Sequence, residues 1–303
     1  MLNSDPEGPD IIGTSPDILD HARNTLIARI SRNQRTIVRA VSLAALAAAV
    51  VVAVCADVRP AVPAARINPA LAKLITEVTT VPENAGDSTS VSFIPVSAQP
   101  ITGAPLKQGG KPEVFYVDAG YCPYCAAQNW ALIVALSHFG RFSGLSTIRT
   151  HLYHGIPPID GWMFYGSSFT SKYLAFVPVE PWSGTLVSAN ANPDEQTSYR
   201  KLQKLTQAQQ AVFNKYDTTH AVPFIDFGNQ NVQTGSIVVP STLEAQTWSQ
   251  IATTLRYGRT SADQAILFAA SVLIVQLCQL TGNRPASVCP TASTSIQAGN
   301  LNI

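Results

Sequence analysis

Two cysteines separated by two residues stand between an apolar run and a helical pattern, in the stretch YVDAGYCPYCAAQNWALIVALSHFG that begins at Tyr116. The residues before them, Glu113 to Asp118, have the composition of a buried strand. From Cys122 to Phe139, apolar side chains recur at helical spacing, and a glycine follows. The stretch therefore predicts a strand, a turn that carries Cys122 and Cys125, and a helix.

This order of elements favours a redox-active pair. Backbone N–H groups at the start of a helix favour an anion, so we expect Cys122 to have a lowered pKa and to react as a thiolate. Pro123 suits the first helical turn, where its missing N–H costs nothing. Cys125 lies three residues on, on the same helix face, and can attack a mixed disulfide formed by Cys122. A structural disulfide between the two cysteines is the plainer alternative.

A metal site would need two more ligands. His151 and His154, or Cys278 and Cys289, are the candidates. Ten residues separate the last two cysteines, a spacing unlike that of a zinc knuckle. We therefore expect no metal and no cofactor, and we expect Cys278 and Cys289 to form a structural disulfide that pins the last helix.

A proline precedes a strand candidate in Ala221 to Asp226 (AVPFID). In thioredoxin-like proteins a cis-proline at such a point faces the cysteines and presents backbone with which a substrate chain pairs. The cis penalty of an X-Pro bond is modest, so a cis Val222–Pro223 bond is feasible. The alternative is a trans proline at the first residue of a strand.

Through CPYC and VPFID the chain resembles the thioredoxin superfamily. More narrowly, it is similar to the domain-of-unknown-function family numbered nine-two-nine, through YCPYCAAQNWALIVALSHFGRFSGL, FYGSSFTSKYLAFVPVE, VPFIDFGN and LCQLTGNRPASVC. The resemblance implies a membrane-anchored thioredoxin-like domain and supplies no known substrate. The chain departs from the family pattern at Gly120, where the family implies an acidic residue, and at Gln128-Asn129, where it implies a charged pair.

An apolar segment from Ile37 to Ala56 is long enough to span a bilayer as a helix. Basic residues precede it, with no acidic residue between Ala22 and Ala56, so the positive-inside rule predicts a cytoplasmic N-terminus and an extracytoplasmic remainder at the cell membrane. A cleaved signal peptide ending near Val54-Cys55-Ala56, or a lipidated Cys55, are the alternatives. Disulfides form and persist outside the cytoplasmic membrane.

The predicted fold class is α/β: a thioredoxin-like three-layer fold, preceded by one transmembrane helix, with a helical insertion at about 153–220 between the CxxC helix and the cis-proline strand. The expected parts are a cytoplasmic basic segment (1–36), the transmembrane helix (37–56), an extracytoplasmic linker with a short helix (57–110), the thioredoxin-like domain (111–290) and a loose tail (291–303).

Other patterns predict further elements inside these parts. They are a short helix at 69–78, strands at 145–152 and 173–179, a helix at 194–216, two strands joined by a turn at Gly228-Asn229, and helices at 241–257 and 262–280. The stretch WMFYGSSF lies inside the insertion and forms either an aromatic surface or part of the core.

The net charge is +1 and no basic stripe appears beyond the first forty residues, so we expect no nucleic-acid partner. We expect a membrane-tethered thiol–disulfide oxidoreductase that acts on exported proteins and exchanges electrons with a membrane redox partner. The alternative is a non-catalytic thioredoxin-fold module that binds or assembles within a membrane complex.

The candidate catalytic residues are Cys122, Cys125, Pro223 and Asp118. Asp118 precedes Cys122 by four positions and could relay a proton for the resolving thiol, or could simply bond the amides of a turn. The residues expected to contact substrate are Tyr121, Pro123, Tyr124 and Val222.

Overall fold

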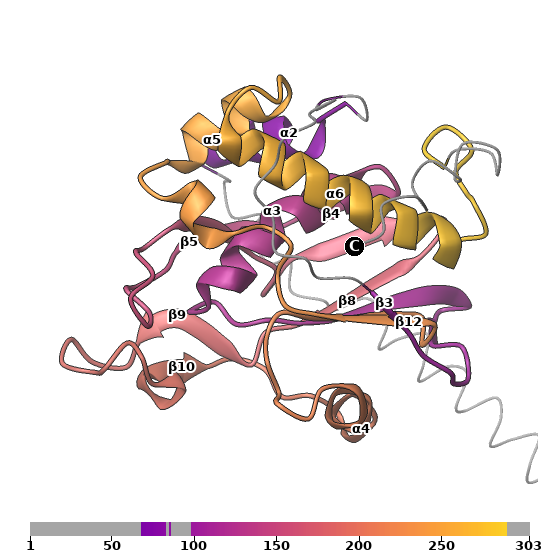
Figure 1. Ribbon diagram of the computed structural model, residues 1–303, viewed down its shortest axis with the longest axis horizontal. Helices are drawn as coiled ribbons and strands as arrows, with labels where there is room; N and C mark the ends of the chain where they lie inside the picture. The colour runs from indigo at the N-terminus through magenta and orange to yellow at the C-terminus, as the bar shows by residue number, and fades with distance from the viewer. Residues whose placement is uncertain (1–67, 83–84, 86–97, 290–303) are drawn as a thin grey trace, which may run out of the picture. The chain divides into compact units, whose positions relative to one another are not determined.

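The computed structural model describes residues 68–82, 85 and 98–289 (Figure 1). The predictions for 1–36, 37–56 and 291–303 lie outside these residues, as do 57–67, 83–84 and 86–97 of the predicted linker. The short helix predicted in the linker is present as α2 (Pro69–Thr79), which begins after the N-cap Asn68.

A mixed sheet is built around β3 (Lys111–Val117), the strand before the two cysteines. On one side β3 pairs in parallel with β8 (Ala175–Val179), and on the other it pairs antiparallel with β11 (Phe224–Phe227). The strands that complete the sheet are β12 (Asn231–Thr234), which follows β11 in a hairpin, and the short β1 (Gln99–Pro100) and β2 (Lys107–Gln108). The predictions of strands at 113–118 and 173–179 and of a hairpin around Gly228-Asn229 are therefore confirmed.

Successive side chains of β3 point to opposite faces of the sheet, so each face packs against its own helices. Val114 and Tyr116 face a core that includes α3 (Pro123–Ser137) and α6 (Ser261–Leu280). Phe115 and Val117 pack on the other face with Phe213 of α4 (Gln207–Tyr216). In Figure 1, α6 and α3 lie above the sheet and α4 lies below it, so the sheet is the middle layer.

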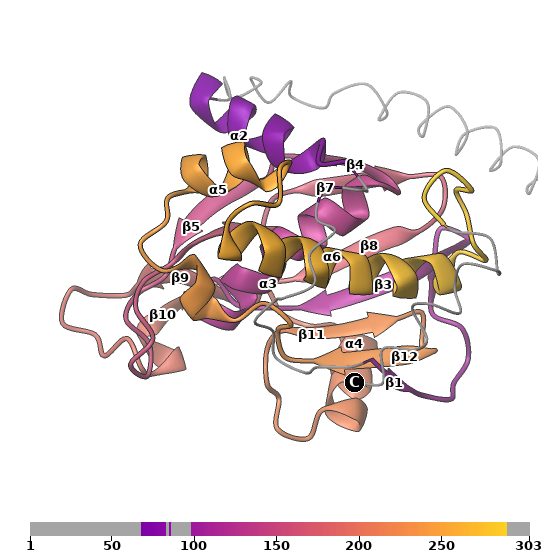
Figure 2. The same cartoon turned by 45° about the horizontal axis from the view of Figure 1, so that its top comes forward.

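The helix α3 is buried along almost its whole length, since its side chains from Cys125 to Leu136 are buried on every face. It packs against α6 over the sheet, and α5 (Trp248–Leu255) and α2 contact each other on the outer side of this pair (Figure 2). Among the described helices, α6 is long and apolar enough to cross a membrane, but more than half of it is buried inside the protein. We therefore interpret α6 as a core helix.

Two predicted helices begin later than expected. Within 194–216 the chain first forms a 3₁₀ turn and then the strand β10 (Tyr199–Lys201), and α4 begins only after Thr206. Thr206 and Gln209 form a capping box, which sets the start of the helix. Similarly, 241–257 contains a 3₁₀ turn followed by α5, which begins after the capping residue Thr247.

The prediction of a helical insertion is correct only in part: the expected strand and helix are present as β8 and α4, but most of the segment is not helical. The chain between α3 and α4, all of which is described, forms mainly antiparallel pairs of strands, and α4 is the only α-helix of the predicted 153–220 segment. The predicted strand at 145–152 is present as β5, but it pairs in its own hairpin and not in the central sheet. The pairs are β4 (Gly140–Ser143) with β7 (Ser168–Ser171), β5 (Ser146–Arg149) with β6 (Asp160–Met163), and β9 (Trp182–Leu186) with β10. The segment also contains β8, which belongs to the central sheet.

Candidate redox site

The two thiols lie at the N-terminus of α3, as the sequence predicts. Cys122 is the N-cap residue, and its Sγ accepts a hydrogen bond from the backbone N–H of Cys125 at 3.4 Å. Pro123 occupies the first turn, where it needs no hydrogen-bond acceptor. Both cysteines are free thiols and buried: Cys122 is 4% exposed and Cys125 is fully enclosed.

The environment moves the pKa values of the two thiols in opposite directions. Burial acts to raise the pKa of Cys122, but hydrogen bonds from the Cys125 thiol and from the backbone N–H groups of Cys125 and Tyr124 outweigh it, so this pKa lies below its ordinary value. Burial raises the pKa of Cys125 well above its ordinary value, and the hydrogen bond to Cys122 and the charges of Cys122 and Asp118 add to the rise. Of the two thiols, Cys122 is therefore the one that ionises more readily.

The strand β11 brings backbone to the thiols. The Val222–Pro223 peptide bond is cis, and the Val222 oxygen lies 3.6 Å from Cys122 Sγ. The half-buried Val222 packs in one cluster with both cysteines. Pro223 lies directly before the first residue of β11, and its backbone oxygen accepts a hydrogen bond from the Gly235 N–H.

Two buried carboxyl groups directly follow the neighbouring strands β3 and β8. Asp118 follows β3 and is buried, with Oδ2 accepting from Asn129 Nδ2 at 2.9 Å. Glu180 follows β8 and is equally buried. Its two carboxylate oxygens accept hydrogen bonds from the backbone N–H groups of Phe164 and Tyr165 at 2.6 and 3.0 Å. The sequence predicted Asp118 as a candidate but missed Glu180. An acid at the end of YLAFVPVE, matching the acid at the end of EVFYVD, was the available signal.

Burial is the main cause of the raised pKa of both acids. The pKa of Asp118 lies well above its ordinary value because the site is dry and because the Glu180 charge is close. Burial raises the pKa of Glu180 to about 7, against the opposing effect of its two backbone N–H donors. A site that keeps carboxylic acids partly protonated at neutral pH can donate and accept protons.

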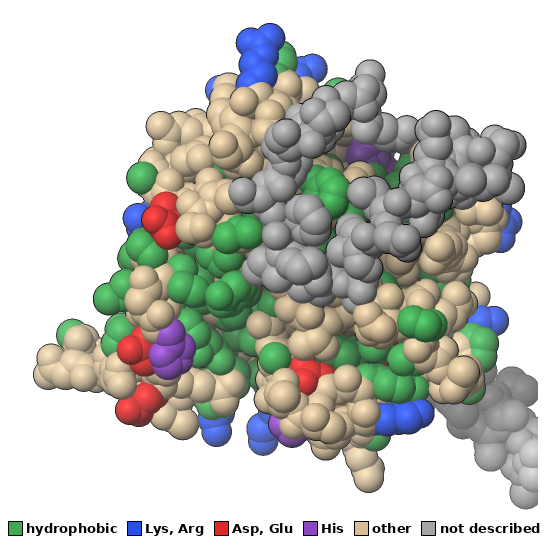
Figure 3. Space-filling model, viewed as in Figure 1, with side chains coloured by type: hydrophobic (Ala, Val, Ile, Leu, Met, Phe, Trp, Pro, Cys, Tyr) green, Lys and Arg blue, Asp and Glu red, His purple; other side chains and the backbone are tan. Residues whose placement is uncertain are grey.

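Aromatic side chains close over the thiols. The Tyr121 and Tyr199 rings stack with centroids 4.7 Å apart, and the Tyr153 ring lies 5.4 Å from that of Tyr121. These three and Trp182 of β9 pack in one cluster with Cys122 and Cys125, and we call them the aromatic cover. In Figure 3 hydrophobic side chains gather on the visible face over β9 and the neighbouring end of α3.

The predicted substrate-contact residues differ in accessibility. Tyr121 and Pro123 are buried, whereas Tyr124 is 36% exposed. Tyr121 also accepts a hydrogen bond from Gln196 at its hydroxyl, which holds the ring inside the cover. The WMFYGSSF stretch is divided: Trp162 and Phe164 belong to the core, and Tyr165 is 44% exposed.

The departures from the family pattern have structural reasons. A Cβ atom on Gly120 would lie 2.6 Å from the backbone nitrogen of Gly184, so no side chain fits at this position. Asn129 joins three partners, since it accepts from the Tyr116 hydroxyl and donates to Asp118 and to the Trp162 oxygen. Gln128 accepts from the Ile237 N–H. Both amide oxygens thus accept hydrogen bonds inside the core.

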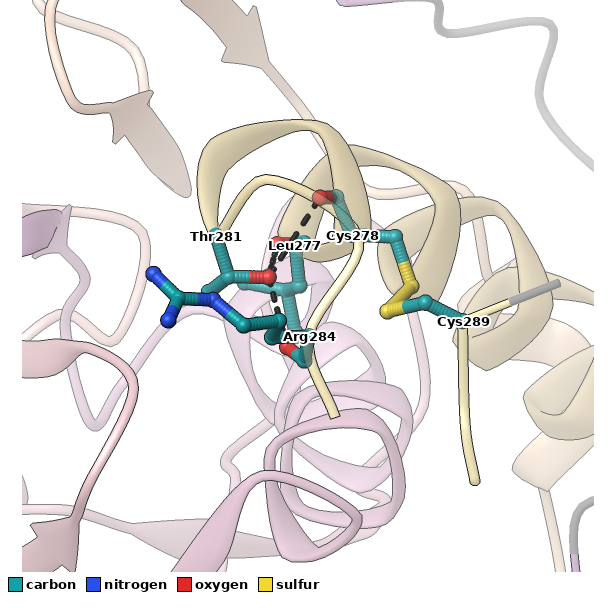
Figure 4. The surroundings of a disulfide bond; sticks show 5 residues. All are labelled: Leu277, Cys278, Thr281, Arg284 and Cys289. Atoms are coloured by element: carbon teal, nitrogen blue, oxygen red, sulfur yellow. Dashed lines mark hydrogen bonds between the residues drawn. A yellow bond between two sulfur atoms is a disulfide. The ribbon is translucent and has the colours of Figure 1, made fainter. Parts of the chain in front are cut away.

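Two further cysteines, Cys278 and Cys289, lie at the end of α6 and just after it. Cys278 and Cys289 form a disulfide (Figure 4), and this pairing takes both out of any metal site. The Thr281 hydroxyl lies within hydrogen-bonding distance of the oxygens of Leu277, Cys278 and Arg284, which ties the turn after α6. Within the described ranges no group of three or more His, Cys, Asp or Glu side chains is placed to hold a metal ion.

The fold and the site together define a mixed α/β protein with a buried dithiol at the start of a core helix. The chain belongs to a family described as a domain of unknown function (DUF929), which matches residues 98–279. The resemblance to this family noted in the sequence is confirmed. Searches of curated proteins and of solved structures found no match.

Proposed function

We propose that the protein is a thiol–disulfide oxidoreductase of the thioredoxin-like type. The observation that carries the proposal is the contrast between its two thiols: Cys122 sits at a helix N-cap with a lowered pKa, and Cys125 is enclosed with a raised pKa. An attacking thiol and a resolving thiol need this division of properties.

The arrangement of the sheet supports the thioredoxin-like class. A strand leads through the cysteines into a helix that lies over the sheet, and the chain returns as the parallel strand β8. The strand on the other side of β3 begins after a cis-proline whose preceding carbonyl faces Cys122. These are the features that the sequence resemblance implies.

The exchange proceeds in two displacements. The Cys122 thiolate attacks one sulfur of a substrate disulfide, the substrate S–S bond breaks, and the other substrate sulfur leaves as a thiolate. Cys125 then loses its proton to a nearby base, for which Asp118 is the candidate, and attacks Cys122 Sγ. The second substrate sulfur leaves, so the substrate gains two electrons and the cysteine pair becomes a disulfide. The reverse sequence oxidises a substrate dithiol.

The proposed location indicates which substrates and redox partner the protein has, and the aromatic cover restricts the form of the substrate. We place the domain on the extracytoplasmic side of the cell membrane, held by residues 37–56, so its substrates are exported proteins and a membrane protein renews its redox state. Because Cys122 is only 4% exposed, a substrate disulfide must lie on a flexible segment that can enter beneath the aromatic cover.

The test is catalysed exchange, measured in both directions with one model peptide in its dithiol and disulfide forms. The full chain carries Cys55→Ser, so that Cys122 and Cys125 are the remaining thiols besides the Cys278–Cys289 disulfide. We expect acceleration in at least one direction, no acceleration by Cys122→Ser, and a trapped mixed disulfide with Cys125→Ser. Equal activity of Cys122→Ser and the parent would exclude the proposal.

A further inference from the structure

The end of the central sheet opposite the two thiols contains a cavity of about 390 Å³. Its walls come from β2 and the start of β3, from the turn between β11 and β12, and from the turn that follows α6. The thiols, in contrast, follow the end of β3 and meet the start of β11. Sites for small molecules have volumes of roughly 300 to 1,000 Å³, so the cavity is large enough for one.

One part of the lining is apolar. Leu280, the last residue of α6, is buried, and Leu106 and Pro112 are half-buried. Gly228 has a positive φ of 67°, and a Cβ atom at this position would overlap Leu280 Cδ1. The absence of a side chain at Gly228 therefore lets Leu280 line the cavity. An apolar fragment of a ligand can lie against these residues.

Two cationic side chains lie at the same cavity, on different segments of the chain. Lys107 of β2 is the register partner of Pro112 in β3, so their side chains stand on the same side of this strand pair. Arg284 belongs to the turn after α6, and in Figure 4 its side chain extends away from the disulfide. Two positive charges thus meet at one opening from two walls.

These two charges are not balanced by acids. Within the part of the chain that the structure describes, neither Lys107 nor Arg284 forms an ion pair, and none of the described residues that line the cavity is acidic. Glu113 and Asp226 are the acids of β3 and β11, and they point to the opposite face of the sheet, with Phe115. The cavity therefore favours a negatively charged ligand.

The end of α6 does not use up the two cations. The C-terminus of a helix carries partial negative charge, which nearby cations can balance. Here, however, the carbonyl oxygens of the last turn are bonded within the chain, since Leu277 accepts from Thr281 N–H and Cys278 accepts from Asn283 N–H. The same bonds hold the turn that carries Arg284 in place before any ligand arrives, which lowers the entropy cost of binding.

We propose that this cavity binds a small organic anion in which a carboxylate or phosphate group is joined to a short apolar part. The anionic group lies between Lys107 and Arg284, whose planar guanidinium matches either oxyanion with two parallel hydrogen bonds. The apolar part packs on Leu106 and Leu280. The site is separate from the redox site, and the proposal does not rest on the proposed function, so either can fail alone.

The experiment uses Arg284 as its own reporter. The full chain is treated with phenylglyoxal in a nonionic detergent, and modification of Arg284 is followed by mass spectrometry of its peptide as ligand is added. Arg200, an exposed arginine that does not line the cavity, is the internal reference. The probes are hexanoate and hexyl phosphate, with hexanol as the neutral control and inorganic phosphate as the control without an apolar part.

We expect hexanoate or hexyl phosphate to protect Arg284 and not Arg200, at concentrations at least about tenfold below those needed with hexanol or inorganic phosphate. The tighter of the two anions identifies the preferred oxyanion. No selective protection of Arg284 by either organic anion would overturn the proposal. Protection by inorganic phosphate alone at equal concentration would also overturn it, because the apolar wall would then play no part.

A matched pair of variants tests the second cation. Lys107→Gln should weaken the protection of Arg284 about tenfold, because one charged contact to the anion is lost. Lys172→Gln is the control: Lys172 is also exposed and stands next to Tyr173, which lines the cavity, but Lys172 itself does not line it. Both lysines are exposed, so we expect both variants to fold. Equal protection in the two variants would contradict a shared anion site.

Discussion

The Sγ atom of Cys122 lies 3.6 Å from the backbone oxygen of Val222, although the residues are 100 positions apart. The cause is the sheet: α3 follows β3, and β11 is the antiparallel neighbour of β3, so the start of α3 and the start of β11 meet at one end. The N-cap thiol and the backbone at the start of β11 thus lie together, and the proposed function uses both. A substrate strand lying along Val222 would bring its own sulfur to Cys122.

The first prediction concerns the reactivity of the two thiols. At pH 7 iodoacetamide should alkylate Cys122 at least about tenfold faster than Cys125. The reason is that the pKa of Cys122 lies below and that of Cys125 above the ordinary value of a thiol. Each pKa unit changes the fraction of reactive thiolate about tenfold. The rates come from mass spectrometry of Cys125→Ser and Cys122→Ser chains that also carry Cys55→Ser. Equal rates would show that the N-cap position does not activate Cys122.

The second prediction concerns the aromatic cover. Tyr153→Ala should raise the rate at which a bulky maleimide labels Cys122 several-fold, with a smaller effect on iodoacetamide, because Tyr153 is the half-buried member of the cover next to Tyr121. Tyr165→Ala is the matched control, since Tyr165 is an exposed tyrosine of the same segment that does not belong to the cluster. If both variants behave like the parent, the cover does not limit access.

The third prediction concerns pH and Asp226. Burial raises the pKa of Asp226 to about 6 from 3.8, and its Oδ2 has no partner among the described residues. Because the folded pKa is raised, the native state binds more protons than the unfolded chain between about pH 4 and 6, and stability falls across this window as pH rises. Asp226→Asn should remove this fall, since Asn can still accept from Asn229 N at Oδ1.

At pH 7 the gain in the free energy of unfolding should be at most about 3 kcal/mol, and near pH 4 it should vanish. Urea unfolding at both pH values measures it. Asp263→Asn provides the contrast: Asp263 is buried and accepts from Thr254, Arg259 and Thr260, so its replacement should destabilise the protein at pH 7. A destabilised Asp226→Asn at pH 7 would contradict this account of the acid.

The fourth prediction concerns the disulfide at the end of α6. Replacing Cys278 and Cys289 with alanine should lower the free energy of unfolding by about 3 kcal/mol, since the bridge closes a loop with a sequence separation of 11. Urea unfolding of the double variant measures the change. Cys122→Ala with Cys125→Ala, which removes two free thiols and no crosslink, should change stability less. Similar losses in both double variants would mean that packing and not the crosslink matters.

Local patterns predicted much of the sheet and the helix that carries the thiols. The apolar run of β3, the N-cap chemistry at Cys122 and the hairpin at Gly228-Asn229 are encoded within a few residues each. Asp118 and Val222 could be placed near the thiols because each is tied to a strand that was recognised.

The insertion could not be predicted in this way, because its strands are stabilised by long-range contacts. The polar residues around Tyr199 are typical of a helix. In the structure, however, the buried Tyr199 ring stacks on Tyr121, 78 positions earlier in the sequence. Tyr199 reaches this position because it lies in an extended segment that pairs with β9. Tertiary packing overrides local propensity in such a segment. Glu180 was missed for a related reason: its role depends on the register of β8 against β3, which local periodicity does not specify.

The most direct test of the central claim is the equilibrium redox titration of Cys122 and Cys125 in the full chain with Cys55→Ser. The protein is equilibrated in graded thiol/disulfide buffers, and its thiols are trapped and counted. We predict a reversible two-electron transition between about −270 and −120 mV, absent in Cys122→Ser, with its position showing whether the protein reduces or oxidises its substrates. A pair that never exchanges with the buffer would contradict the oxidoreductase account and favour a thioredoxin-fold binding module.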